Sequence, residues 1–318
     1  GALAVTGDYS STTSGTSNLR LGVNAGNSIQ SGGNYNVAVG DEAGTAITTG
    51  DGNVLIGYTA GDAINTGGYN VGIGDRALTN TTTANANVAV GADSLFTNIL
   101  AAKNVALGSD ALKTLNTGTA TDTFNTAVGH AAGVAVTTGI KNTIIGGLAG
   151  DAITTGNNIV AVGYQALSYD QQGSGSVAIG NQALTTQRFT TATSVHNVAV
   201  GQQAGQEITT GIENTIIGGL AGDALTTGFE NVVVGKSALT TDTLGRGSTA
   251  LGYATLFNQN FTTATTTQNT AVGYYAGVSI TTGVENTLIG GLAGDALTDA
   301  DFNVAVGSVA LSLDTLGS

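Results

Sequence analysis

The sequence contains 318 residues with a formal net charge of −13, and it includes 50 glycines but no proline, cysteine, methionine or tryptophan. Its eight lysine and arginine residues are not clustered, which argues against nucleic acid or an anionic membrane as a partner. No run approaches the roughly 20 apolar residues needed for membrane insertion. The lack of cysteine excludes disulfides and thiol chemistry.

A five-residue stretch, Asn-Val-Ala-Val-Gly with close variants, recurs along the chain, for example at residues 36–40 and 142–146. It occurs 17 times, and 12 of the 16 spacings between its closing glycines are 17 residues. Repetition at a fixed period of this size predicts a solenoid. The hydrophobic residues, 41% of the chain, recur in register with it, which argues against disorder. The closing glycines are Gly22, Gly40, Gly57, Gly74, Gly91, Gly108, Gly129, Gly146, Gly163, Gly180, Gly201, Gly218, Gly235, Gly252, Gly273, Gly290 and Gly307.

Within each copy the pattern predicts a short β-strand. In Val37-Ala38-Val39 the two valines share one face and the alanine takes the other, as the two-residue period of a strand requires. Gly40 then allows the chain to turn. Asn36 at the strand start tolerates turn conformations, and stacked copies predict an asparagine ladder from coil to coil.

Two kinds of coil follow the closing glycine. In one kind the chain reads x-x-Ala-Gly, as at Ala43-Gly44, with an aliphatic residue seven positions after the closing glycine and then usually Thr-Thr-Gly. In the other kind it reads x-x-Ala-Leu, as at Ala166-Leu167, and the later aliphatic residue is usually missing. This exchange predicts a narrow core that receives one large apolar group per coil.

The domain organisation follows from these blocks. We expect residues 1–17 to form an irregular N-terminal partial coil and residues 18–318 to form one continuous parallel β-solenoid of about 17 coils. A 72-residue super-repeat covers 125–196 and 197–268, and a partial copy covers 269–318.

Each full super-repeat ends in a four-residue insertion rich in threonine, such as the one between Gln187 and Val195. Insertions at equivalent places lie on one face of a solenoid, so we expect evenly spaced protrusions. At a stacking distance of about 4.8 Å, the coils predict a rod roughly 80 Å long.

The ends of the chain suggest a further hypothesis. A partial strand closes on Gly7, and if Ser318 of one copy abutted Gly1 of the next, the 17-residue period would nearly continue. Copies would then stack end to end into a filament. The alternative is that the chain, which lacks methionine, is a processed product or a segment of a longer fibre.

The unit N-[VT]-A-[VI]-G followed by x-x-A-[LG] resembles the head repeats of trimeric autotransporter adhesins of the YadA type and related repeats of phage tail fibres. The resemblance extends from about Asn18 to Ser318, although the coils are longer than the short repeats typical of those heads. It implies a left-handed parallel β-roll and a homotrimer of chains wound side by side, with the strand valines facing the core. It also implies an extracellular, cell-surface or virion-surface location.

We expect no catalytic, cofactor-binding or metal-binding residues, and therefore no enzyme. The two histidines, His130 and His196, stand where sister coils carry other residues, and a repetitive rod offers no pocket that would position a general base. The aspartate of the recurring Ala-Gly-Asp-Ala is expected to cap a turn; a calcium site is the alternative, but one carboxylate per coil supplies few ligands. These aspartates are Asp62, Asp151, Asp223 and Asp295.

The sequence therefore favours a structural protein, the rod-like shaft of an extracellular or virion fibre, with copies of itself as partners. One alternative is an ice- or surface-binding solenoid that uses the threonine pairs, such as Thr48-Thr49, although the pairs do not continue through the leucine-type coils. Another is an adhesin domain that binds a cell-surface receptor or glycan. Four tyrosines are candidates for such a site: Tyr164, Tyr253, Tyr274 and Tyr275.

Overall fold

The structure is a computed structural model that describes residues 13–315. The chain divides into two compact units, residues 1–148 and 149–318. Each unit, in its described part, is a parallel β-solenoid built from coils with a 17-residue period and contains no helix. The partial strand closing on Gly7 and the junction at Ser318 lie outside the described residues, so the end-to-end hypothesis stays a prediction.

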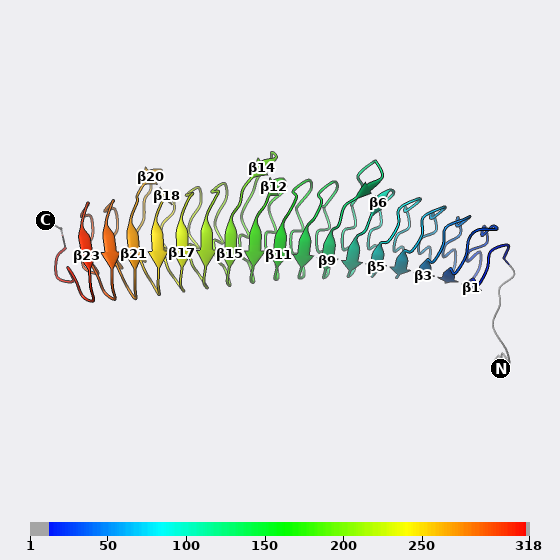
Figure 1. Cartoon of the computed structure of the whole chain (residues 1–318), viewed down its shortest axis with the longest axis horizontal. Helices are drawn as coiled ribbons and strands as arrows, with labels where there is room; N and C mark the ends of the chain where they lie inside the picture. Colours follow the sequence, from blue (N-terminus) through cyan, green and yellow to red (C-terminus); the bar gives the residue numbers. More distant parts are fainter. Residues whose placement is uncertain (1–12, 316–318) are drawn as a thin grey trace, which may run out of the picture. The chain divides into compact units, whose positions relative to one another are not determined.

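In the first unit, each coil contributes one three-residue strand to a parallel sheet, and successive strands pair in register (Figure 1). Val37 pairs with Val54 and Val54 with Val71, so equivalent residues stack along the sheet. The strands are β1 (Leu19–Leu21), β2 (Val37–Val39), β3 (Val54–Ile56), β4 (Val71–Ile73), β5 (Val88–Val90), β7 (Val105–Leu107), β9 (Thr126–Val128) and β10 (Thr143–Ile145).

The second unit repeats this arrangement, again with one parallel strand per coil. Its strands are β11 (Val160–Val162), β13 (Val177–Ile179), β15 (Val198–Val200), β16 (Thr215–Ile217), β17 (Val232–Val234), β19 (Thr249–Leu251), β21 (Thr270–Val272), β22 (Thr287–Ile289) and β23 (Val304–Val306). The strands predicted from the five-residue stretch are confirmed in both units.

The threonine-rich insertions each form a second, smaller strand. This strand pairs in parallel with a two-residue strand of the preceding coil, giving three small sheets (Figure 1). In Figure 1 the chain at these sheets reaches beyond the edge of the neighbouring coils, as expected. The pairs are β6 (Ala101–Ala102) with β8 (Thr121–Asp122), β12 (Gly173–Ser174) with β14 (Thr193–Ser194), and β18 (Gly245–Arg246) with β20 (Thr265–Thr266).

The alternation within the strands is confirmed, but the expectation that the strand valines face the core is wrong. In β2 the central Ala38 is fully buried, whereas Val37 and Val39 lie on the outer face and are partly exposed. The interior is too narrow for a valine pair, because large side chains from the turns already fill it. A Cβ atom added at Gly72, the centre of β4, would lie 3.1 Å from Leu55 Cδ2 and 3.2 Å from Leu78 Cδ1.

The exchange of core volume between coil types involves three positions, one more than the sequence analysis identified. Leu55 at the centre of β3 lies between Gly44 and Gly61, the glycines of two successive Ala-Gly coils. A Cβ atom at Gly44 would lie 2.9 Å from Leu55 Cδ1, and one at Gly61 would lie 2.7 Å from Leu55 Cδ2. The strand centre thus supplies volume that the two glycines omit, which keeps the interior close-packed.

The predicted asparagine ladder is present inside the coils. The Asn53 amide donates to Asn36 Oδ1 at 3.0 Å and to the Gly67 carbonyl at 3.0 Å, and the Asn53 backbone N–H also donates to Asn36 Oδ1 at 2.9 Å. Asn70 repeats the pattern one coil later. Because these side chains are buried, each satisfied amide avoids the cost of a polar group without a partner.

Candidate functional surfaces

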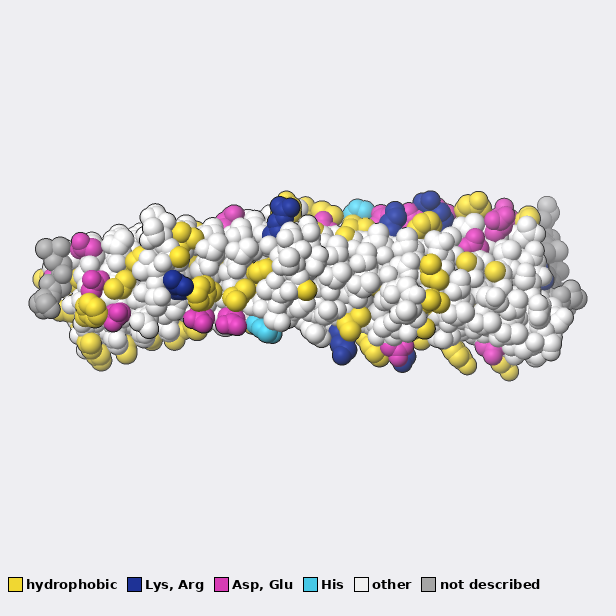
Figure 2. Space-filling model, turned by 90° about the horizontal axis from the view of Figure 1, so that it is seen from above, with side chains coloured by type: hydrophobic (Ala, Val, Ile, Leu, Met, Phe, Trp, Pro, Cys, Tyr) yellow, Lys and Arg dark blue, Asp and Glu magenta, His cyan; other side chains and the backbone are white. Residues whose placement is uncertain are grey.

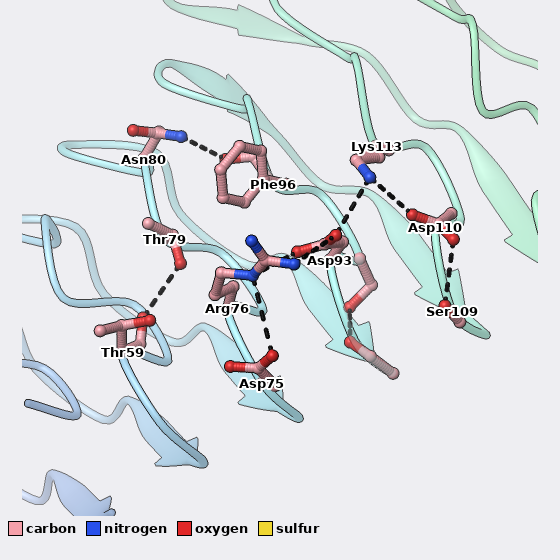
Figure 3. Close-up of polar contacts among 12 residues, drawn as sticks. Thr59, Asp75, Arg76, Thr79, Asn80, Asp93, Phe96, Ser109, Asp110 and Lys113 are labelled. Carbon is pink, nitrogen blue, oxygen red and sulfur yellow. Dashed lines mark hydrogen bonds and ion pairs between the residues drawn. The ribbon is translucent and has the colours of Figure 1, made fainter. Parts of the chain in front are cut away.

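The ion pairs among the described residues lie in the leucine-type coils of the first unit, and most of them meet at Asp93 (Figure 3). Arg76 Nε lies 2.9 Å from Asp93 Oδ1, and Lys113 Nζ lies 3.0 Å from Asp93 Oδ2 and 2.8 Å from Asp110 Oδ1. The hydrogen bond from Lys113 holds the pKa of Asp110 below its usual value. Three successive coils are joined in this way, and the cluster is best explained as a cross-link.

A buried polar network occupies the leucine-type coils of the second unit. Gln259 Nε2 donates to Asp242 Oδ2 at 2.6 Å and to Ser248 Oγ at 2.9 Å, and the Asn269 amide donates to Gln259 Oε1 at 2.9 Å. The backbone N–H groups of Gly245 and Phe261 donate to the other oxygen of Asp242. Burial raises the pKa of Asp242, and these hydrogen bonds oppose the increase.

The same network recurs 72 residues earlier in the chain. Gln187 joins Asp170 Oδ2 at 2.6 Å, Ser176 Oγ at 3.2 Å and Asn197 Nδ2 at 3.0 Å. Burial again raises the pKa of Asp170. Sequence reasoning missed both networks, although a signal was available: an aspartate and a glutamine replace the aliphatic residue seven positions after the closing glycine, exactly where a buried residue is needed.

Neither predicted surface histidine forms part of a site. His130 and His196 are both exposed, and their coils place no nucleophile–base pair beside them in the printed contacts of the described chain. Across residues 13–315, no group of three or more histidine, aspartate or glutamate residues could hold a metal ion.

The aspartates of the Ala-Gly-Asp motif lie at equivalent turns and are half-buried. One carboxylate oxygen of each is buried and accepts no hydrogen bond within the described chain. Burial raises the pKa of Asp62, Asp151 and Asp223, and backbone N–H groups at the same turn oppose this effect. The turn-capping prediction therefore has partial support at these three residues.

The threonine pairs serve the backbone at their first member. Thr154 Oγ1 donates to the Gln171 carbonyl at 2.9 Å, and Thr226 Oγ1 donates to the Thr243 carbonyl at 2.9 Å. These hydroxyls satisfy a carbonyl of the next coil, so half of each pair is already engaged. The ice-binding alternative, which needs a regular and available array, stays an untested prediction.

Three of the four candidate tyrosines come together on the second unit. The rings of Tyr253 and Tyr274 stack with centroids 5.6 Å apart, and Tyr275 lies edge-on to them at 5.4 and 4.4 Å. Tyr253 raises the pKa of Tyr275 through a hydrogen bond between the side chains. Tyr164 is half exposed and takes no part in this cluster.

The outer faces of the strands form a stripe without charged residues in each unit. The two outward positions of every main-sheet strand carry only valine, isoleucine, leucine or threonine, and these side chains are partly or largely exposed. Charged side chains are also sparse on the face shown in Figure 2. We call these outward positions the strand face.

Comparisons with protein-family models, with curated proteins and with solved structures gave no match. No helix capable of crossing a membrane occurs in the described part of the chain.

Proposed function

We propose that this protein is a structural β-solenoid that associates side by side with copies of itself, as the shaft of an extracellular or virion-surface fibre. The strand face is the observation that carries the proposal. Outward-facing valine and isoleucine form a continuous row in each unit, with no charge to keep it hydrated. A large exposed apolar patch of this kind marks an interaction site.

The partner is a second copy because the strand face repeats at the coil spacing. Two such faces present rows with the same period, so their side chains can interdigitate along the length of a unit. Three chains with their strand faces turned inward would bury all three rows. The homotrimer and the left-handed β-roll implied by the resemblance are part of this proposal.

The role we propose is mechanical. Each coil buries few large side chains, so stability accumulates from coil to coil, and the stacked backbone and the asparagine ladder resist extension along the sheet. The net charge of −13 would limit indiscriminate bundling. We propose no enzymatic activity, because the described side chains form no nucleophile–base arrangement.

The mass of the purified chain in solution tests the proposal. We expect light scattering after size exclusion to give the mass of three chains. The variant V198K/V200K places two lysines on the strand face of β15 and should dissociate to single chains while its circular dichroism spectrum stays unchanged. Both valines are outward-facing, so the coil interior is preserved.

The matched control Q202K/T210K adds the same charge at exposed residues outside the strand face and should keep the mass of the original protein. A single-chain mass for the unmodified protein at every concentration would reject the assembly. Equal dissociation by both variants would mean that net charge, and not the strand face, controls association.

A further inference from the structure

The tyrosine cluster departs from the repeat in a way that the fold does not require. At the equivalent positions 72 residues earlier, the sister coils carry Asn181, Gln202 and Gln203 in place of Tyr253, Tyr274 and Tyr275. Both sets belong to coils with the same strands and turns. Because the polar set suffices to build the coil, the aromatic set has a reason other than folding.

The cluster borders a surface pocket of about 410 Å³. Tyr253, Tyr275 and Phe257 supply aromatic walls, while Ser237 and Asn258 supply a hydroxyl and an amide. No charged side chain lines it. This volume lies in the range of small-molecule sites, and the combination of aromatic surface with a few polar groups is typical of such sites.

We propose that this pocket binds a neutral pyranose sugar, as a free saccharide or as one unit of a glycan. A pyranose has an apolar face of C–H groups, which can lie on a tyrosine ring, and a rim of hydroxyls, which can pair with Ser237, Asn258 and the tyrosine hydroxyls. Tyr274 is 57% exposed and Tyr253 is 41% exposed, so ring surface is available to a ligand. The uncharged lining disfavours sialic or uronic acids, which would need a cationic partner.

This site goes beyond the proposed fibre and does not depend on it, since all its residues lie in one chain. A monomeric protein could bind sugar, and a trimer could lack the site. Sugar binding and chain mass are therefore read separately.

Saturation-transfer NMR on the full chain tests the site, with methyl α-D-glucopyranoside, methyl α-D-mannopyranoside, methyl β-D-galactopyranoside and N-acetylglucosamine as probes at millimolar concentration. We expect transfer to the ring C–H protons of at least one probe. The variant Y253N/Y274Q/Y275Q installs the sister residues, which the same type of coil tolerates, and should weaken binding about tenfold or more.

Two further variants keep the result specific. Y58N/Y69N/Y164N removes three exposed tyrosines outside the cluster and should leave transfer unchanged. Y253F/Y274F/Y275F keeps the rings but removes the hydroxyls, and should retain part of the binding. Circular dichroism checks that every variant folds.

Three results would overturn the proposal. These are no transfer to any probe, equal transfer in the sister-residue variant, and a sister-residue variant that changes the mass of the assembly without changing sugar binding. The last result would show that the tyrosines are a contact between copies of the chain.

Discussion

Gln259 and Ser248 together repair a gap in the asparagine ladder. Ser248 stands where most coils carry asparagine, and its short side chain cannot reach the next coil. Gln259 Nε2 donates to Ser248 Oγ at 2.9 Å, and Gln259 Oε1 accepts the hydrogen bond from Asn269 that a ladder asparagine would otherwise accept. The ladder therefore continues through a side chain from a different part of the coil.

We predict that Q259L destabilises the protein by about 3 kcal/mol, because it leaves the buried Asp242 carboxylate without its closest donor. The first unit contains an apolar counterpart of this site: Asn98, Leu115 and Asn104 occupy the places of Asp242, Gln259 and Ser248 and are fully buried.

The transplant variant D242N/Q259L/S248N installs that set. It should recover most of the stability lost in Q259L, as measured by denaturant unfolding followed by circular dichroism. If the transplant is no more stable than Q259L, the three residues do not act as one unit.

The buried aspartates predict a dependence of stability on pH. Burial raises the folded-state pKa of Asp242 and Asp170 above the ordinary value of 3.8. As pH falls through the raised pKa, the folded state takes up protons before the unfolded state does, so stability increases, and the increase levels off below about pH 4. We expect the melting temperature to rise between pH 7 and this limit.

The transplant variant serves as the control for this effect, because it lacks one of the two buried carboxyls. Its melting temperature should rise less over the same pH range. A steeper rise in the transplant than in the unmodified protein would show that other carboxyls, such as the half-buried Asp62, dominate the titration.

Much of this architecture was predictable because a fixed period forces equivalent residues into register. The strand at Val37–Val39 and the ladder at Asn36 follow from that register. The direction of the valines did not, since Val-Ala-Val is apolar on both faces and only the volume of the interior selects alanine. Asp242 was also missed, because a single aspartate in a turn gives no sign that a glutamine 17 residues later will bury and satisfy it.

The closing glycines form a column, and each allows its neighbour to approach. Gly235 has φ +140°, and an added Cβ atom would lie 2.2 Å from the Gly252 oxygen. We predict that G235A costs about 2–5 kcal/mol from backbone strain and overpacking combined. At Gly307, with φ +127°, an added Cβ atom would meet nothing described within 4 Å, so G307A should cost only the strain, about 1–2 kcal/mol. Denaturant unfolding of both variants separates the two effects, and equal losses would show that stacking distance is not what requires glycine.

The exchange of volume around Leu55 can be measured as a coupling between two residues. L55A should cost about 2–5 kcal/mol because it opens a cavity. G61A places a Cβ atom 2.7 Å from Leu55 Cδ2 at φ +56°, and should cost about 1–3 kcal/mol from overpacking beyond the strain. In L55A/G61A the alanine Cβ enters space that the leucine has left. The double variant should therefore lose at least about 1 kcal/mol less than the sum of the single variants.

The strain at this position can be removed from the comparison with Gly118, which has a similar φ of +67° and no described atom within 4 Å of an added Cβ. G118A should cost the strain alone, so the difference between G61A and G118A isolates the contact with Leu55. Strictly additive losses in L55A and G61A would mean that the two residues do not share one volume. A coupling of the predicted sign would show instead that the strand centre and the turn glycine exchange a fixed amount of space, which is how coils of two kinds can stack at a constant spacing.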